Sequence, residues 1–258
     1  MRILLIGCGA LGSALARGLA SAANLTLYDT RADNARSLAT EVGAHVATTL
    51  EAEALAAGRY DLVIEAASQA ALRQIAPLAL RAGRRVVALS VGALGNAAFL
   101  AELERLVAQH GGSLHVPSGA VGGLDALRAA HEAGLDEVVL TTTKPPAGVG
   151  LDAATMVEPQ VLFDGPARAA VVAYPKNVNV AAAVALAGVG FDRTRVRLIA
   201  DPAVERNSHQ LEARGAFGRL SCTLENAPSP DNPASSHMAA LSALALVRRL
   251  MSGLTIGT

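Results

Sequence analysis

The chain of 258 residues is 52% hydrophobic and 17% charged, which allows a sizeable core in one large domain or two moderate ones. Lys and Arg together number 22, as do Asp and Glu, and this balance excludes the strongly basic surface typical of proteins that bind nucleic acid or anionic membranes. Two cysteines, Cys8 and Cys222, are too few for a disulfide framework or a zinc site.

Strands and helices alternate through the first half of the chain. Apolar runs of strand length occupy 2–6, 25–29, 60–67, 84–91 and 112–119. Stretches with helical spacing lie between them, over 10–22, 33–42, 68–82 and 96–110. Alternation at this spacing predicts βαβ units and hence a parallel sheet with helices on both faces.

A glycine-rich turn, GCGALG, joins the first strand to the first helix and has the spacing of a dinucleotide-binding fingerprint. Gly7 permits the tight turn, Gly9 lets a pyrophosphate approach the backbone, and Gly12 lets the helix pack closely on the sheet. The helix directs free amides and its positive dipole end at the phosphates. We therefore predict a Rossmann-type cofactor domain and count Ala10 and Leu11 among its cofactor-binding residues.

The end of the second strand bears on the choice of cofactor. Asp29 lies 17 residues after Gly12, near the offset of about 20 expected for an acid that binds the ribose hydroxyls. A carboxylate accepts hydrogen bonds from a free 2′-hydroxyl and repels a 2′-phosphate, which favours NAD. Arg31 could clasp a 2′-phosphate if Asp29 swings aside, or it could be a solvated turn residue. NAD is the first expectation, and NADP stays open.

The pattern changes after residue 120. A strand is predicted over 136–146, and 194–202, 206–218 and 218–228 alternate with period two, as in an antiparallel sheet with one covered face. The stretch PSPDNPASS is a turn-rich break. The last segment, 235–251, has the pattern of an amphipathic helix.

Two domains follow from this change. We predict an α/β chain in which a doubly wound parallel sheet precedes a smaller α+β domain for catalysis and dimerisation. The cofactor domain is expected over 1–115, with 232–258 and its helix packing back on it, and the second domain over 116–231. One sheet face of the second domain is left to cover, and a partner's sheet could cover it, so a homodimer or higher homo-oligomer is expected.

Several dense motifs of the second half resemble the L-aspartate dehydrogenase family. They are PSGAVGGLDAL, the KPP turn, FDGPA, YPKNVNVAAA, RNSHQLE, GAFG and ENAPS. Together with GCGALG they cover nearly the whole chain in order. Two departures are small: Thr143 stands where family members often carry Arg, and NPASS replaces a common NPKTS.

The resemblance implies NAD(P)-dependent, reversible oxidative deamination of L-aspartate to iminoaspartate, which water hydrolyses to oxaloacetate and ammonia. It also implies a link to NAD biosynthesis, because iminoaspartate is a precursor of quinolinate. It places cofactor contacts at Ala120 and Asn179 and the catalytic histidine at His209.

The chemistry itself calls for an acid–base residue. Hydride loss from Cα needs a neutral amine, and hydrolysis of the imine needs an activated water, for which a histidine is suited. His209 lies in a strand-like segment between polar neighbours, and from the residues alone a single histidine in a strand is more often structural than catalytic. His237, at the start of the last helix, is the runner-up.

Substrate carboxylates need cations or directed amides. Lys144, fixed beside Pro145, is a candidate, although it could also be a surface lysine at a strand end. Further substrate-binding candidates are Ser118, in the loop of small residues over 117–123 (the small-residue loop), and Asn177. Asn177 could instead cap the following helix. Asn179 is expected to bond the nicotinamide carboxamide or ribose.

Two other interpretations stay open. One is a different two-domain reductase, such as a dihydrodipicolinate reductase or a homoserine dehydrogenase, although the chain has no His-His pair. The other is a module that binds NAD(P) and senses its redox state without catalysis. No apolar run reaches 18 to 20 residues and the N-terminus has no secretory organisation, so we expect a cytoplasmic protein with small-molecule substrates and no nucleic-acid, membrane or metal partner.

Overall fold

The computed structural model describes residues 1–50, 55, 57–152, 156–174, 178–254 and 256. The chain divides into two compact units. Unit 1 comprises Met1–Pro117 and Ala243–Gly253, and unit 2 comprises Ser118–Ser242 and Leu254–Thr258. The last helix, α9 (His237–Met251), therefore contributes its residues from 243 onward to unit 1. Residues 232–242, which we expected to pack with the first domain, belong to unit 2.

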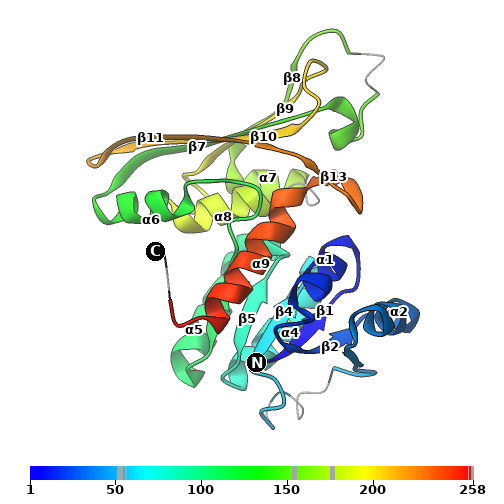
Figure 1. Cartoon of the computed structure of the whole chain (residues 1–258). Helices are drawn as coiled ribbons and strands as arrows, with labels where there is room; N and C mark the ends of the chain where they lie inside the picture. Colours follow the sequence, from blue (N-terminus) through cyan, green and yellow to red (C-terminus); the bar gives the residue numbers. More distant parts are fainter. Residues whose placement is uncertain (51–54, 56, 153–155, 175–177, 255, 257–258) are drawn as a thin grey trace. The chain divides into compact units, whose positions relative to one another are not determined.

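Unit 1 is built on a parallel sheet with the strand order β3-β2-β1-β4-β5-β6 (Figure 1). Its strands are β1 (Arg2–Ile6), β2 (Asn24–Tyr28), β3 (His45–Val46), β4 (Leu62–Glu65), β5 (Arg85–Ala88) and β6 (Ser113–His115). The winding reverses between β1 and β4, and ligands of such sheets bind beside this switch point, at the carboxyl ends of the strands. The predicted doubly wound sheet is confirmed, with the short strand β3 as an addition that the sequence did not indicate.

Helices pack against this sheet and close its core. They are α1 (Ala10–Leu19), α2 (Ala32–Val42), α4 (Gln69–Arg81) and α5 (Ala97–His110), with the 3₁₀ turn η1 (Val91–Gly95). Leu5 of β1, Leu15 of α1 and Val247 of α9 are fully buried in one hydrophobic cluster. A side chain at Gly18 would lie 2.8 Å from Leu244, so glycine lets α9 approach α1 closely. The end of α9 thus returns to the first domain, as predicted.

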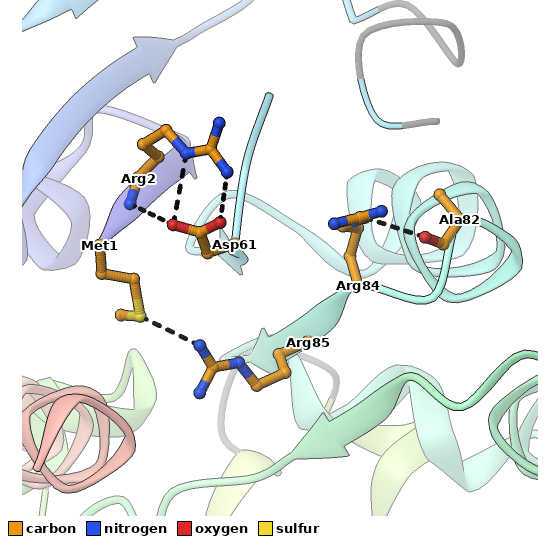
Figure 2. A network of polar contacts seen from close by, with 6 residues as sticks. All are labelled: Met1, Arg2, Asp61, Ala82, Arg84 and Arg85. Carbon is orange, nitrogen blue, oxygen red and sulfur yellow. Dashed lines mark hydrogen bonds and ion pairs between the residues drawn. The ribbon is translucent and has the colours of Figure 1, made fainter. Parts of the chain in front are cut away.

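Arginine contacts fix the amino ends of the central strands (Figure 2). Arg2 lies with its Nη2 2.6 Å from Asp61 Oδ1, and its backbone amide donates to Asp61 Oδ2 at 2.8 Å. The bond from Arg2 lowers the pKa of Asp61 to about 2. Arg85 contacts Met1 Sδ at 3.3 Å and donates to the Leu250 carbonyl near the end of α9. These contacts hold the strand edge that is opposite the ligand-binding edge.

Unit 2 contains a five-stranded sheet of order β11-β10-β7-β9-β8. Its strands are β7 (Leu135–Lys144), β8 (Gln160–Pro166), β9 (Arg195–Ala200), β10 (Asn207–Gly215) and β11 (Gly218–Asn226). Three helices, α6 (Leu124–Glu132), α7 (Ala167–Ala173) and α8 (Asn179–Ala187), pack on one face (Figure 1). Gly188, after α8, lies in contact range of both Leu127 and Val138, which brings helix and strand together.

The second half differs from the prediction in three places. The sheet is mixed, since β7 and β9 pair in parallel. The chain between them passes through the 3₁₀ turn η2 (Pro146–Val149), β8, α7 and α8, and a connection of this length allows parallel pairing, whereas a hairpin does not. The turn-rich break contains a small hairpin of β12 (Pro228–Ser229) and β13 (Asn232–Ser236). Strand β8 was not predicted.

Candidate active site

Two glycines of the first turn are required by the fold itself. Gly7 has a φ of +96°, and a Cβ there would lie 2.7 Å from the carbonyl oxygen of Ala66 at the end of β4. A Cβ at Gly12 would overlap the Gly7 carbonyl oxygen. Glycine therefore allows α1 to start directly behind β1, which is the local geometry of a dinucleotide turn.

Gly9 has a different status. It is exposed and precedes Ala10, the first residue of α1, and a Cβ built on it would meet nothing within 4 Å. The fold does not need glycine at this position, and the helix start has no side-chain cap. The bare turn and the free amides of the first helical turn, which includes Leu11, fit a pyrophosphate that approaches the backbone.

Asp29, just after β2, is held by two backbone amides. Its Oδ2 accepts from the Cys8 amide at 2.8 Å, and its Oδ1 accepts from the Arg31 amide at 2.8 Å. The first bond ties the carboxylate directly to the glycine turn. With the Asn34 amide turned so that its oxygen faces Arg31, that oxygen accepts from Nη2 at 2.9 Å and from Nε at 3.0 Å. The side chains of Asp29 and Arg31 are therefore both held by hydrogen bonds just after β2.

Glu65 is a buried carboxylate that sequence reasoning missed. It ends β4 with none of its surface exposed. Its oxygens accept from the amides of Ala67 and Ser68 at 2.8 Å, and from the Ser90 hydroxyl and amide at 2.9 and 3.1 Å. Burial raises its pKa, and these four hydrogen bonds oppose the rise. Glu65 thus joins the loops after β4 and β5, beside the switch point. The available signal was an acid that ends an apolar run.

Buried polar side chains gather at one end of the unit 2 sheet. Among the described residues, eight polar or charged side chains are buried, and six belong to this end: Thr142, Lys144, Asn207, His209, Asn226 and Ser236. The carboxyl ends of β7 and β11 meet the start of β10 there. Polar groups are costly to bury, so a concentration of this kind makes this end of the sheet the candidate functional site.

Strand register arranges five of these side chains in two rows. His209 pairs with Thr142 on β7 and with Leu224 on β11, and Asn207 pairs with Asn226. Continuing the β10–β7 register by one residue places Lys144 beside Asn207. Gly148 supports this placement, since its Cβ would lie 3.6 Å from both the Lys144 Cβ and the Asn207 Oδ1.

His209 is 4% exposed, and its Nδ1 lies 2.9 Å from the Thr142 hydroxyl oxygen. Burial, and then the positive charge of Lys144, lower the pKa of His209 to about 4. The imidazole is therefore neutral near pH 7. Because Nδ1 is engaged with Thr142, Nε2 is the ring nitrogen available to a substrate or a water. Thr142 was also missed, although it alternates with Lys144 along the strand.

Lys144 is 6% exposed, which excludes the alternative of a surface lysine. Burial lowers the pKa of its ammonium. A cation beside a neutral imidazole in a buried setting favours an anionic ligand, because a carboxylate would offset the cost of burying the charge.

The small-residue loop lies near the start of α8. Gly119 has a φ of +67°, and its Cβ would lie 3.9 Å from Val180 in the first turn of that helix. Ala120 is buried, Ser118 is half-buried, and Asn179 is exposed as the first residue of α8. The loop that carries Ala120 therefore approaches the helical turn that Asn179 begins. Asn177 lies outside the described residues.

The predicted residues thus fall into two groups. The glycine turn, Asp29 and Arg31 belong to unit 1, and the loop after Pro117, Lys144, Asn179 and His209 belong to unit 2. Within the described part of the chain, no three His, Cys, Asp or Glu side chains cluster as metal ligands. None of the helices described is both long and apolar enough to span a membrane.

Comparisons with known proteins match both halves of the chain. A family model for the NAD-binding domain of homoserine dehydrogenase matches residues 7–117, and one for the C-terminal domain of aspartate dehydrogenase matches residues 125–250. The L-aspartate dehydrogenase of Methanosarcina barkeri is 42% identical over 271 aligned positions, which cover 100% of both chains. The L-aspartate dehydrogenase 2 of Bordetella bronchiseptica is 42% identical and covers 99% of both.

Solved structures agree with these matches. The crystal structure of aspartate dehydrogenase from Thermotoga maritima superposes with a TM-score of 0.82 at 26% identity and covers 100% of this chain and 99% of its own. A hyperthermophilic archaeal homoserine dehydrogenase in complex with NADPH has a TM-score of 0.61 at 10% identity, a likeness in fold alone.

Proposed function

The chain belongs to the L-aspartate dehydrogenase family, and from this premise we propose that it oxidises L-aspartate to iminoaspartate, which water hydrolyses to oxaloacetate and ammonia. The family and the cofactor domain make it an NAD(P)-dependent oxidoreductase. The observation that carries the choice of substrate is the buried pair of Lys144 and His209, a cation and a neutral base in a site with six buried polar side chains.

A bound nicotinamide cofactor would supply the hydride acceptor, and the residues of this chain supply binding and proton transfer. Lys144 holds a substrate carboxylate with its ammonium group. His209, through Nε2, takes a proton from the substrate ammonium group, which leaves the nitrogen lone pair that the C=N bond requires. The negative charge of the bound substrate offsets the positive charge of Lys144. It thereby raises the pKa of His209 toward the range in which the ring can accept a proton.

Once His209 has released this first proton to solvent, hydrolysis of the imine uses the same base. Water adds to the imine carbon, and its proton passes to Nε2 of His209; the ring then returns a proton to the departing nitrogen, so that oxaloacetate and ammonia leave. Thr142 holds Nδ1 throughout, at 2.9 Å, and so keeps the ring in one orientation. Ser118 is a further substrate-binding candidate at the small-residue loop.

The cofactor is proposed to bind in unit 1 at Gly7, Gly9, Ala10, Leu11 and Gly12. Ala120 and Asn179 are proposed as cofactor contacts on the family resemblance. We favour NAD over NADP because Asp29 is fastened by two amide hydrogen bonds, and swinging aside for a 2′-phosphate would break both. The Asn34 oxygen facing Arg31 supports the same preference, since this guanidinium already has an acceptor.

The proposal includes a homodimer built on the sheet of unit 2. On the face opposite α6, α7 and α8, Val161 is 49% exposed and Val139 and Ile199 are half-buried. An apolar patch among charged neighbours is suited to an isologous contact with a second copy.

Reduction of NAD and NADP by the purified protein tests the function. L-Aspartate is expected to drive formation of the reduced cofactor, faster with NAD, and oxaloacetate with ammonia to drive the reverse. L-Homoserine is tested alongside, because homoserine dehydrogenase shares this fold. A protein that binds the cofactor but reduces it with L-homoserine and not with L-aspartate would contradict the proposal.

A further inference from the structure

Asn226, the last residue of β11, has a buried side-chain oxygen without a hydrogen-bond partner. The residue is 3% exposed and belongs to the buried polar cluster around Lys144 and His209. Within the described part of the chain, three buried side-chain atoms have no partner, and Oδ1 of Asn226 is the one that belongs to this cluster. A buried acceptor left unsatisfied is unfavourable, and in native proteins such atoms are rare and call for a ligand or another donor.

The orientation of this amide is fixed by its nitrogen. Nδ2 donates to the Ala120 carbonyl at 3.0 Å and to the Leu224 carbonyl at 3.3 Å. Turning the amide over would place Oδ1 against two carbonyl oxygens, which are acceptors only. The side chain is therefore held with both donor positions used and its acceptor free for a donor from outside.

An amino acid substrate needs an acceptor for its amino group in addition to sites for its carboxylates. Asn226 pairs with Asn207, which lies beside Lys144, and His209 is its diagonal neighbour across the sheet. Paired and diagonal side chains lie about 5–8 Å apart, so a small substrate can contact Asn226 and His209 together. Lys144 lies one strand further along the sheet, on β7. Lys144 offers a cation for a carboxylate, but an amino acid also brings N–H donors, and these require an acceptor.

We propose that Oδ1 of Asn226 accepts a hydrogen bond from the amino group of the substrate. The inference rests on the proposed function, because it identifies the group that the same site uses to recognise an amino dicarboxylate. An amide does not titrate, so the oxygen can accept from an ammonium, an amine or an imine N–H, while protons move through His209. Asn226 thereby selects an amino dicarboxylate over a dicarboxylate that lacks the amino group.

Asn226→Ala with two matched ligands tests this assignment. The protein is saturated with reduced cofactor, so that L-aspartate binds without turnover, and L-aspartate and succinate are titrated by the change in cofactor fluorescence. We expect the substitution to raise the dissociation constant of L-aspartate at least tenfold, which corresponds to the loss of a hydrogen bond to a charged group. The dissociation constant of succinate is expected to change less than twofold. Equal weakening of both ligands, or of neither, would overturn the assignment.

Two controls separate this role from a structural one. Nδ2 supports the Ala120 loop, so the dissociation constant of the reduced cofactor is measured in parallel and is expected to change less than twofold. If cofactor binding were weakened as much as L-aspartate binding, the role of Asn226 would be to support the Ala120 loop instead. Thr223→Ala, at an exposed position on the opposite face of β11, is expected to leave both titrations unchanged.

A second measurement uses the unaltered protein, in case Asn226→Ala does not fold. In a crystal structure of the ternary complex with reduced cofactor and L-aspartate, Oδ1 is expected within hydrogen-bond distance of the substrate nitrogen. An amino group bonded elsewhere, with a water on Oδ1, would refute the inference. If the unaltered protein binds succinate but neither binds nor oxidises L-aspartate, the proposed function fails instead.

Discussion

Gly9 and Gly12 occupy the same sequence fingerprint and have different physical duties. A Cβ at Gly12 would overlap the Gly7 carbonyl oxygen, whereas a Cβ at Gly9 would meet nothing within 4 Å. The requirement for glycine at position 12 thus arises inside the protein, whereas at position 9 the fold imposes no such requirement. The sequence fingerprint contains both glycines alike, whereas the structure shows that a side chain is excluded at position 12 and accommodated at position 9.

We therefore expect opposite effects from two alanine substitutions. Gly12→Ala is expected to lower the free energy of unfolding by about 1–3 kcal/mol, because α1 must move away from the turn. Gly9→Ala is expected to change the free energy of unfolding by less than about 0.5 kcal/mol and to weaken cofactor binding at least tenfold. Denaturant unfolding and cofactor titration measure the two quantities. Cofactor affinity unchanged in Gly9→Ala would contradict a pyrophosphate at this turn.

His209 is the residue on which proton transfer is proposed to depend. His209→Ala is expected to lower kcat at least a hundredfold and to leave the dissociation constant of the cofactor nearly unchanged, since general acid–base catalysis contributes about 10²–10⁴-fold. His237→Ala is the matched control, because His237 starts α9 and was the runner-up in the sequence. Full activity of His209→Ala would remove this residue from the mechanism.

At the scale of elements, Glu65 joins the ends of β4 and β5. Three donors converge on Oε1 and one on Oε2, so each of the two loops that border the switch point is hydrogen-bonded to the same carboxylate. A carboxylate has acceptors only, and this matches a site made of four donors. The loops are thereby held in one arrangement without help from a ligand.

Glu65→Gln tests this connection between strands. If the Gln oxygen takes the place of Oε1, its NH₂ group faces the Ser90 amide, which is also a donor. We expect a loss of about 1–3 kcal/mol in the free energy of unfolding, together with weaker cofactor binding. Ser90→Ala removes one of the four hydrogen bonds and is expected to cost less. A Glu65→Gln protein as stable as the unaltered chain would contradict the requirement for acceptors alone at this position.

At the scale of the whole molecule, the open face of the unit 2 sheet decides the proposed assembly. Ile199→Glu is expected to shift the protein from dimer to monomer, because it places a charge in the middle of an apolar contact. Ala129→Glu, at an exposed position of α6, serves as the control and is expected to stay dimeric. Sedimentation velocity distinguishes the two species, and a dimer that withstands Ile199→Glu would place the interface elsewhere.

Both halves of the chain support one assignment of family. The cofactor half matches a domain model named for homoserine dehydrogenase, and the second half matches one named for aspartate dehydrogenase. Glycine turns and parallel sheets are shared among many dehydrogenases, so the first half alone leaves the substrate open. The polar side chains of the second half carry the distinction, and they were the basis of the resemblance in the sequence.

The sequence by itself determined the features that depend on neighbours along the chain. The alternation of apolar runs and helical stretches predicted the parallel sheet, and the glycine spacing predicted the turn from β1 to α1, because both follow from local backbone geometry. Period-two alternation also predicted β10, in which buried and half-buried side chains alternate along most of the strand. The family motifs identified His209 as a candidate, and the need for a cation near the substrate carboxylates identified Lys144, but neither indicated how these residues are buried.

Tertiary structure alone decided what depends on residues far apart in the sequence. The parallel pairing of β7 with β9, the two amides on Asp29, the four donors on Glu65 and the row of Lys144, Asn207 and Asn226 all join distant segments. The low pKa of His209 has the same origin, since burial and the charge of Lys144 arise only once β7 and β10 are side by side. Electrostatics and hydrogen bonding act through space, and a linear pattern of residues does not record those distances.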